Sequence, residues 1–276
     1  MIKNSTSIAI LMATYNGERF IREQLDSLFA QTYTDWTLFV RDDGSTDNTI
    51  SIIESYQKEH HNIVIIDNEG KNLGPFMNFM ELLQKVDSPL YMFIDQDDVW
   101  LPHKIENEIA AFRSLNCDET TPGLVFTNLQ LVDENLNILS ASFWKSIHFS
   151  PYIFNSFAEQ AFIGYITGCT MLFNKKAKEI SFPVAQYAPM HDWWVAICIY
   201  KANGKVGFIE TPQMLYRKHG NNVTGNFVNS QKGKSLCVRF KEMATQYQLM
   251  KNCGAVSSFF NYICLKNKIK NARKKI

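Results

Sequence analysis

The chain has 276 residues, 46% of them hydrophobic, which is enough for one large α/β domain with a sizeable core. Its net charge of +1 hides an uneven distribution: residues 232–276 contain eleven Lys or Arg and one Glu, whereas residues 1–231 contain 17 Lys or Arg and 26 Asp or Glu. We therefore expect no nucleic-acid partner for the acidic body, and no apolar run is long enough for a signal peptide or a membrane-spanning helix.

The first 115 residues alternate between apolar strands and amphipathic helices. Strands are predicted at residues 8–13, 36–40, 63–66 and 91–94, because each is a short apolar or alternating run that ends in turn-forming residues. Apolar residues at helical spacing follow each strand: Ile21, Leu25 and Leu28, then Ile50, Ile53 and Tyr56, then residues 76–86, then Ile105, Ile109 and Phe112. This alternation predicts a mostly parallel, Rossmann-like sheet flanked by helices.

The pattern is less regular after residue 116, so we expect this half to be mixed. Strands are predicted at residues 124–129, 167–173 and 205–209, and residues 140–162 are rich in aromatic side chains that form either a packed helix or the wall of a binding site. The sequence from residue 232 on is helical and basic in character. We predict a domain at residues 1–231, with halves 1–115 and 116–231, and a basic helical C-terminal extension at 232–276.

Polar side chains follow three of the predicted strands, and they are Thr14-Tyr15-Asn16, Asp42-Asp43 and Asp95-Gln96-Asp97-Asp98. The carboxyl ends of parallel strands lie along one edge of a sheet, where ligands bind. The first two clusters offer hydrogen-bond partners for a base and a ribose. Three carboxylates within four positions repel one another unless they share a cation such as Mg²⁺ or Mn²⁺ or some of them protonate. The alternative is a surface turn that caps the helix beginning near Pro102.

Other motif classes are absent or uninformative. No Gly-x-Gly-x-x-Gly follows the first strand and no Gly-Lys-Ser/Thr phosphate loop occurs, which argues against a dinucleotide oxidoreductase and a nucleoside triphosphatase. The six cysteines show no metal-binding or redox spacing, so reduced thiols in a cytosolic protein are expected.

Six short motifs, in this order, resemble family 2 glycosyltransferases with the GT-A fold, above all the bacterial members that build capsule, rhamnan or O-antigen polysaccharides. The motifs span about residues 7–225, and they are Ala13-Thr14-Tyr15-Asn16-Gly17, Arg41-Asp42-Asp43-Gly44-Ser45-Thr46-Asp47, Asn72-Leu73-Gly74, Asp95-Gln96-Asp97-Asp98-Val99-Trp100, His191-Asp192-Trp193-Trp194 and Tyr216-Arg217-Lys218-His219-Gly220-Asn221-Asn222. The resemblance implies that residues 1–115 bind the nucleotide and residues 116–231 the acceptor.

The resemblance also implies roles for single residues. The nucleotide would contact Thr14, Tyr15, Asn16, Glu18, Asp42 and Asp95, while Asp43 caps its own loop. Asp95, Asp97 and His219 would hold Mn²⁺ or Mg²⁺. Asp192 matches the general base of inverting members, and His191, Trp193 and Trp194 would bind the acceptor.

Simpler structural interpretations exist for several of these residues. Asp42 and Asp43 could form only a turn, Asp192 could be the N-cap of the next helix, and His219 could be hydrogen-bonded in place. Arg217 and Lys218 could pair with a diphosphate or with the acidic body. Many relatives carry Glu-Asp where this chain has His191-Asp192, which changes the expected acceptor geometry. No Gln-x-x-Arg-Trp motif of processive synthases is present, so transfer of a single sugar is favoured.

The expected activity is therefore metal-dependent, inverting transfer of one sugar from a nucleotide donor to a saccharide or lipid-linked saccharide acceptor in surface polysaccharide synthesis. The donor expected first is dTDP-rhamnose, followed by UDP-glucose, UDP-galactose or a UDP-N-acetylhexosamine. The alternatives are a nucleotidyltransferase and a catalytically silent subunit that supports a partner enzyme. We expect a cytoplasmic location, with the basic tail either on the inner face of the membrane or solvated.

Overall fold

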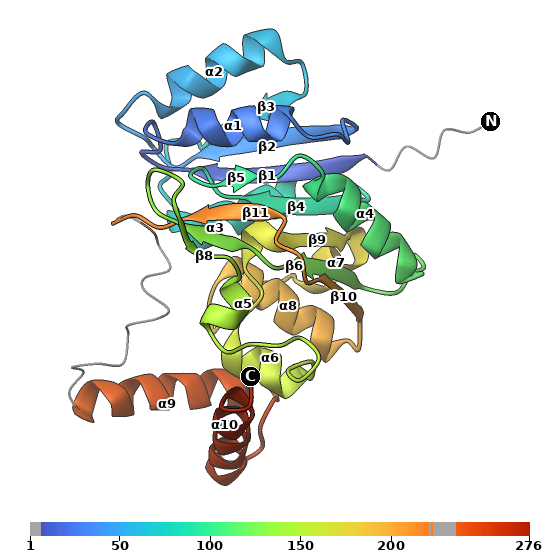
Figure 1. The fold of residues 1–276 in the computed structure, drawn as a ribbon, viewed down its shortest axis with the longest axis vertical. Helices are drawn as coiled ribbons and strands as arrows, with labels where there is room; N and C mark the ends of the chain where they lie inside the picture. Colours follow the sequence, from blue (N-terminus) through green and yellow to red (C-terminus); the bar gives the residue numbers. More distant parts are fainter. Residues whose placement is uncertain (1–6, 221, 223–235) are drawn as a thin grey trace.

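The computed structural model describes residues 7–220, 222 and 236–276, and it is built on a seven-stranded sheet (Figure 1). The strand order is β10-β6-β9-β4-β1-β2-β3, and all neighbours are parallel except β9, which runs antiparallel to β4 and β6. The strands are β1 (Ile8–Thr14), β2 (Trp36–Asp42), β3 (Ile63–Ile65), β4 (Leu90–Ile94), β6 (Gly123–Thr127), β9 (Met171–Asn174) and β10 (Lys205–Ile209). The mostly parallel sheet flanked by helices confirms the predicted fold class.

The sheet forms because its central strands are continuous apolar runs. All five residues of β4 are buried, and so are six of the seven in β1, as expected for parallel strands covered on both faces. The covering helices are α1 (Ile21–Phe29), α2 (Thr49–Glu59), α3 (Gly74–Lys85), α4 (Lys104–Ser114), α7 (Lys175–Ile180) and α8 (His191–Lys201). The first four helices lie where the apolar spacing predicts them.

A smaller four-stranded sheet, which the sequence did not predict, has the order β5-β11-β7-β8. Its strands are β5 (Val99–Trp100), β7 (Gln130–Val132), β8 (Ile138–Ser140) and β11 (Met214–Arg217). Strands of two to four residues are too short to show a period of two. This sheet matters for the site, because β5 continues the acidic turn after β4 and β11 pairs with it.

The second half corrects one expectation and decides between two alternatives left open by the sequence. The strand predicted at 167–173 begins as a 3₁₀ turn, η1 (Gly168–Thr170), before β9. The aromatic-rich segment 140–162 forms α5 (Phe143–Ser146) and α6 (Phe157–Ile163). Its residues Phe143, Trp144, Phe149 and Phe154 are buried in the core, so the segment is packing rather than a binding wall.

The C-terminal segment forms α9 (Leu236–Cys253) and α10 (Phe259–Arg273), which lie at one end of the molecule (Figure 1). Gln246 Nε2 of α9 donates to the Phe162 carbonyl, and Lys268 of α10 pairs with Glu159 at 2.9 Å. Both contacts tie the tail to α6. No helix among the described residues is both long enough and apolar enough to cross a bilayer.

Candidate active site

The carboxyl ends of β1 and β4 open into a cavity of about 940 Å³. Its wall is completed by the start of α3, η1, the start of α8 and the segment that follows β11. Most of the predicted site residues line it, namely Thr14, Tyr15, Asn16, Asp95, Asp97, His191, Asp192 and His219. The fold therefore brings residues from distant parts of the chain to one space.

The loop after β1 is fixed by the loop after β2. Thr14 Oγ1 donates to Asp42 Oδ1 at 2.8 Å, and the Asn16 N–H donates to Ser45 Oγ at 2.8 Å. Asn16 Oδ1 in turn accepts from the Thr46 N–H at 2.8 Å. These hydrogen bonds use the polar groups of Thr14 and Asn16 to hold the rim of the cavity in shape.

Tyr15 and Glu18 lie in this same loop but differ in what they face. Tyr15 is 50% exposed and lines the cavity, so its ring offers an aromatic surface to a ligand. Glu18 Oε2 accepts from the N–H and the side-chain amide of Asn48, and Glu18 is not among the lining residues. Glu18 thus holds the start of α2. It does not line the cavity, where the expected contact with a nucleotide would be made.

The Asp42 carboxylate is hydrogen-bonded by four donors of the protein, so it does not make the expected contact with a base. Its carboxylate accepts from Thr14 Oγ1, Ser45 Oγ and the N–H groups of Gly44 and Ser45, at 2.5–2.9 Å. The side chain is buried and Asp42 is not among the residues that line the cavity. The reason is steric: the chain turns sharply at Gly44, whose φ of +91° brings two N–H groups onto the carboxylate.

Asp43, expected to cap its own loop, is the acid of this pair that lines the cavity. Its carboxylate accepts from the N–H groups of Leu73 and Gly74 at 2.7 Å each and from Arg41 Nη1 at 2.9 Å. Asp43 therefore joins the loop after β2 to the start of α3.

The acidic turn after β4 is locked to the loop after β1 by Gln96. The Tyr15 N–H donates to Gln96 Oε1, and Gln96 Nε2 donates to the Tyr15 carbonyl, both at 3.0 Å. A Cβ on Gly17 would lie 2.4 Å from Gln96 Oε1, so only glycine leaves room for this pair. The acids on either side of Gln96 are thus held at a fixed distance from the rim.

Asp95 lines the cavity directly after the last residue of β4. Burial raises its pKa to about 7, and the negative charges of Asp97 and Asp192 add to the shift. Asp192, from α8, is therefore close enough to act electrostatically on the carboxylate at the end of β4. The acidic turn and the start of α8 face the same space.

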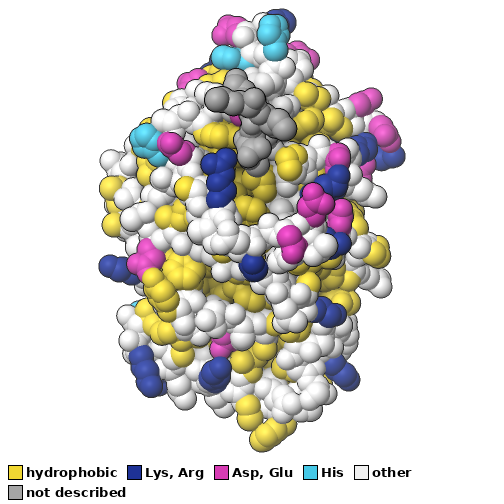
Figure 2. All heavy atoms as spheres, turned by 90° about the vertical axis from the view of Figure 1, so that its right-hand side faces the viewer, with side chains coloured by type: hydrophobic (Ala, Val, Ile, Leu, Met, Phe, Trp, Pro, Cys, Tyr) yellow, Lys and Arg dark blue, Asp and Glu magenta, His cyan; other side chains and the backbone are white. Residues whose placement is uncertain are grey.

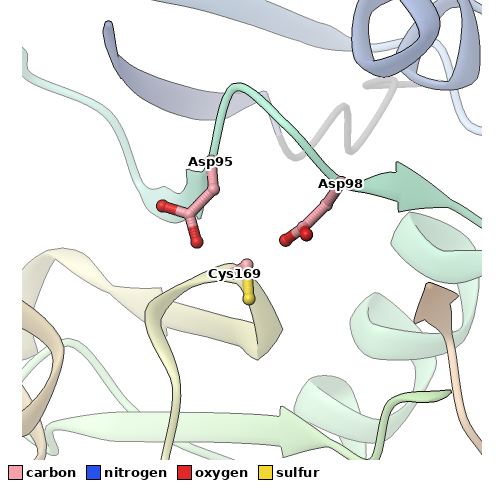
Figure 3. A group of neighbouring side chains, drawn as sticks. All are labelled: Asp95, Asp98 and Cys169. Carbon is pink, nitrogen blue, oxygen red and sulfur yellow. The ribbon is translucent and has the colours of Figure 1, made fainter. Parts of the chain in front are cut away.

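Asp95 and Asp98 point toward Cys169 of η1 (Figure 3). Among the described residues, these three form the group whose candidate ligand atoms all lie within 4.8 Å of one another. Burial, together with the charges of Asp98 and Asp95, raises the pKa of the Cys169 thiol well above its usual value. A protonated thiol donates a hydrogen bond to the carboxylates and does not act as a thiolate ligand.

Asp98 joins the acidic turn after β4 to strand β11. It is fully buried, and its Oδ1 accepts from the Arg217 N–H at 3.0 Å. Burial, with the charges of Asp97 and Asp95, raises the pKa of Asp98 well above its usual value. Arg217 Nε donates to the Asp97 carbonyl at 2.9 Å, so β11 holds two residues of the acidic turn in place. The guanidinium is used in this way and also pairs with Glu23, so of the two alternatives for Arg217 the structure shows pairing with the acidic body.

His219 and Asp97 form the part of the wall best suited to a divalent cation. His219 Nε2 lies 2.8 Å from Asp97 Oδ2, and Asn222 Oδ1 accepts from the His219 N–H at 2.7 Å. Carboxylate oxygen and imidazole nitrogen are both ligands that Mn²⁺ accepts, and Asp95 lines the same cavity, although its carboxylate lies in a group with Asp98 and Cys169 and not with this pair. The residues present therefore fit a divalent cation.

Asp192 lies in the first turn of α8, where it is half-buried and lines the cavity. Its Oδ2 accepts from the Gly168 N–H at 2.9 Å, and its Oδ1 accepts from the Trp193 N–H at 2.6 Å. The N-cap of α8 is Met190, so Asp192 is not the N-cap of this helix. Both oxygens keep a lone pair that a hydroxyl in the cavity could use.

His191 lies beside Asp192 and is 93% buried, since only 7% of it is exposed. Its ring stacks on Phe79, with centroids 4.1 Å apart, and meets the edge of Phe93 at 4.8 Å. Neither ring nitrogen has a hydrogen-bond partner among the described residues. Burial lowers the pKa of His191, so the neutral ring can accept or donate a hydrogen bond to a ligand.

Trp193 and Trp194, expected at the acceptor, are not among the residues that line the cavity. Trp193 Nε1 donates to the Gln160 carbonyl at 2.9 Å, and its ring fills the space beside Gly164. Trp194 is 7% exposed, and its Nε1 donates to the Ser181 carbonyl at 2.8 Å. These indoles anchor α8 and so position Asp192.

Several lining residues were not singled out from the sequence. They include Arg19 and Phe20 before α1, Glu134 in the β7–β8 turn, and Gly168 and Cys169 of η1. No motif marks the last three, because they reach the cavity only through the second sheet and the antiparallel strand β9. Arg19 and Phe20 lie two and three residues after the first motif, and this nearness was the one available signal.

The chain is similar to known proteins over most of its length. Residues 9–180 match the family described as glycosyl transferase family 2. The chain is 34% identical to the dTDP-rhamnosyl transferase RfbG of Shigella flexneri over 91% of this chain and 86% of that protein. It is 24% identical to the UDP-Glc:alpha-D-GlcNAc-diphosphoundecaprenol beta-1,3-glucosyltransferase WfgD of Escherichia coli over 88% of this chain and 85% of that protein.

Solved glycosyltransferases with the GT-A fold share the architecture. One is the mannosyltransferase PcManGT from Pyrobaculum calidifontis in complex with GDP-Man and Mn²⁺, which is 16% identical, has a TM-score of 0.59 and matches 89% of this chain and 63% of that chain. At this identity the likeness concerns the fold alone. The family match covers more than half of the chain, and the protein belongs to glycosyl transferase family 2.

Proposed function

We propose that this glycosyltransferase moves a single sugar, with inversion, from a nucleotide-sugar to a saccharide acceptor. The observation that carries the proposal is the meeting of Asp97 and Asp192 in one cavity, where burial and then the charges of both acids raise the pKa of Asp95. One acid belongs to the turn after β4 and the other to the start of α8. A donor sugar between them would have its leaving group on one side and an acceptor on the other.

The reaction needs a base on the acceptor side of the anomeric carbon. In the proposed step, an acceptor hydroxyl oxygen forms a bond to that carbon while the bond to the nucleoside diphosphate breaks, and the hydroxyl proton passes to Asp192. The Gly168 and Trp193 N–H groups hold the Asp192 carboxylate in one orientation for this transfer. Attack from the face opposite the leaving group gives inversion.

Asp97, Asp95 and His219 would hold Mn²⁺ or Mg²⁺, in keeping with the Mn²⁺ in the mannosyltransferase of similar fold. The ion would neutralise the charge that develops on the departing diphosphate. Tyr15, with half of its surface exposed at the rim, would cover the base, and Asp43 replaces Asp42 as the acid of that pair that faces the nucleotide.

The donor proposed first is dTDP-rhamnose, because the curated relative with 34% identity is a dTDP-rhamnosyl transferase. UDP-glucose follows, because a second relative uses it on a diphosphoundecaprenol-linked GlcNAc. The acceptor is a growing surface polysaccharide or its lipid-linked precursor, and the product belongs to capsule or O-antigen synthesis. His191, with both ring nitrogens free of protein partners among the described residues, is the side chain proposed to bind an acceptor or sugar hydroxyl.

A lipid-linked acceptor would place the protein on the inner face of the cytoplasmic membrane. In α9 and α10, Phe240, Phe259 and Phe260 are 64%, 46% and 74% exposed, and the exposed Lys270, Lys274 and Lys275 lie on or just after α10. Figure 2 shows mostly Lys and Arg among the charged side chains at the lower end of the drawn face, the end where α10 lies. Apolar bulk beside cationic charge fits an anionic leaflet.

Liposome flotation tests this location. Phe240→Ser with Phe260→Ser should lower binding to vesicles that contain anionic lipid and leave turnover on a soluble acceptor unchanged. Equal flotation of the variant and the parent protein would remove the membrane contact from the proposal.

The reaction itself is tested by release of nucleoside diphosphate from a panel of sugar donors with Mn²⁺. Asp192→Asn should abolish transfer while the variant still binds the nucleotide, and Asp87→Asn, on an exposed acid far from the cavity, serves as the matched control. Full turnover by Asp192→Asn would refute the assigned base. Release of pyrophosphate from a nucleoside triphosphate and a sugar 1-phosphate, with no diphosphate release from the sugar donors, would indicate a nucleotidyltransferase. Nucleotide binding without any release would indicate a silent subunit.

A further inference from the structure

The charges that line the cavity are unbalanced. Five acids face it, namely Asp43, Asp95, Asp97, Glu134 and Asp192, whereas Arg19 is the one Lys or Arg among the described lining residues. A diphosphate ligand would add further negative charge to this space. A divalent cation would neutralise part of this negative charge, and a cationic side chain beside it would neutralise more.

Arg19 is held by a contact that is easily broken. Arg19 Nη2 pairs with Glu134 Oε2 at 2.5 Å, and the two side chains are 63% and 37% exposed. An ion pair this exposed contributes little to stability, because water and salt screen it. The guanidinium also lies over the Phe20 ring, with its central carbon 4.7 Å from the centroid. The ring supports the side chain without fixing the direction of its N–H groups.

Arg217 lies on the same Phe20 ring, 4.5 Å from the centroid, but every side of it is occupied. It is 1% exposed, its Nη1 donates to the Glu134 carbonyl at 2.7 Å, and its Nη2 pairs with Glu23 at 2.5 Å. Because Arg217 holds the Glu134 backbone, only the Glu134 side chain is free to release Arg19. One arginine is fixed and the other can change partners.

The position of Arg19 relative to the metal site follows from the same ring. The His219 ring lies 5.1 Å from the Phe20 centroid, and His219 Nε2 contacts Asp97. Arg19, Arg217 and His219 thus surround one aromatic side chain, and the proposed metal ligands lie next to the place where Arg19 enters the cavity. Because the Arg19 guanidinium and the His219 ring lie 4.7 and 5.1 Å from the Phe20 centroid, the long Arg19 side chain could turn toward a phosphate held at Asp97 and His219.

We propose that Arg19 is a diphosphate-binding residue that leaves Glu134 and pairs with a phosphate of the ligand in the cavity. The inference rests on the proposed function, because it requires a diphosphate ligand. Glu134 then acts as a competitor that occupies Arg19 when the phosphate is absent. The diphosphate belongs either to the nucleotide donor or to a diphosphate-linked lipid acceptor, and the two sources share the same chemistry.

The experiment compares Arg19→Gln, Glu134→Gln and the control Arg22→Gln, which removes an exposed arginine of α1 that does not line the cavity. Calorimetry with Mn²⁺ measures the affinity for dTDP and UDP, for the monophosphates dTMP and UMP, and for farnesyl diphosphate with farnesol as its control. Arg19→Gln should weaken binding of the diphosphates by about tenfold and change monophosphate binding less than about twofold. Glu134→Gln should strengthen diphosphate binding, because it removes the competitor.

The outcomes separate the sources. Loss confined to dTDP or UDP assigns Arg19 to the donor, and loss confined to farnesyl diphosphate assigns it to the acceptor. Identical affinities in Arg19→Gln, Arg22→Gln and the parent protein overturn the inference, as does weaker diphosphate binding in Glu134→Gln. Failure of the proposed function is recognised separately, because the parent protein would then bind neither nucleotide.

Discussion

The acids in the loop after β2 and the acids in the turn after β4 differ in how fully their hydrogen-bonding capacity is used. In the loops after β2, Asp42 accepts four hydrogen bonds and Asp43 accepts three. In the turn after β4, Asp98 Oδ2 has no partner among the described residues, and the pKa of Asp95 is raised to about 7. Both regions are rich in Asp, but only the second is short of donors.

This difference separates acids that are held by protein donors, such as Asp42, from Asp95, which lines the cavity and is available to a ligand; Asp98 is buried outside the cavity lining and supports the turn. Buried polar groups are normally satisfied, and a group left unsatisfied in a cavity costs stability that only a ligand or a proton can recover. His191, with two unpartnered ring nitrogens, belongs to the second class. Perturbed and unpartnered groups that share a cavity are the expected features of a reaction site.

The largest effect is expected from Asp97→Asn. Loss of the charge beside His219 should lower kcat/KM by about 10²–10³-fold, because the developing charge on the leaving diphosphate loses its compensation. The fold should be unchanged, since the Asp97 backbone carbonyl still accepts from Arg217 Nε. Steady-state kinetics with saturating Mn²⁺ measures the loss. A variant within twofold of the parent protein would place Asp97 among the structural acids.

Asp42→Ala should lower stability, whereas Asp97→Asn should lower activity and leave the fold unchanged. Removing an acceptor of four hydrogen bonds leaves buried donors unpaired, and we expect a loss of about 2–3 kcal/mol in the free energy of unfolding. Asp95→Asn should instead leave stability unchanged or raise it by about 0.5–2 kcal/mol, as for other site residues selected for function. Chemical denaturation measures both. Destabilisation by Asp95→Asn as large as that by Asp42→Ala would contradict the comparison.

The stability gained by Asp95→Asn should increase with pH. The pKa of Asp95 is raised from 3.8 to about 7, so the folded protein retains a proton that the unfolded chain has lost. The resulting penalty is absent well below pH 4, grows as the unfolded carboxyl ionises, and is complete above about pH 7. The advantage of Asp95→Asn should therefore be larger at pH 8 than at pH 5.

Cation binding should depend on the ionisation of Asp95 and should strengthen as the pH rises. A cation requires the ionised carboxylate, so affinity for Mn²⁺ with dTDP or UDP should rise by about tenfold between pH 6 and pH 8, and binding near pH 7 should release a proton. Calorimetry in buffers of different ionisation enthalpy measures this release. Asp95→Asn should remove most of the pH dependence, whereas an unchanged profile would assign the titration to another group.

The sequence predicted the large sheet well because its strands are apolar runs and its helices are long enough to show a period. It did not predict the second sheet, whose strands have two to four residues, and therefore missed Glu134 and left open which anion Arg217 pairs with. The order of Asp42 and Asp43 could not be derived either. Which of two neighbouring acids faces a cavity depends on the turn at Gly44, and motif spacing does not encode that direction.

Trp194→Phe should give the smallest effect and tests the other part of the comparison, the side chains that position the reacting acids. The substitution removes one hydrogen bond to the Ser181 carbonyl, which should cost about 1 kcal/mol of stability, and it leaves the wall of the cavity intact. The KM for the acceptor should change by less than about twofold, because KM reports contacts with the substrate.

His191→Phe is the matched contrast, since it keeps a ring stacked on Phe79 but removes both unpartnered nitrogens. This variant should be at least as stable as the parent protein and should bind the acceptor or the donor sugar more weakly. If Trp194→Phe raised the acceptor KM tenfold while His191→Phe left it unchanged, the acceptor would contact the indole, and the buried histidine would have only a packing role.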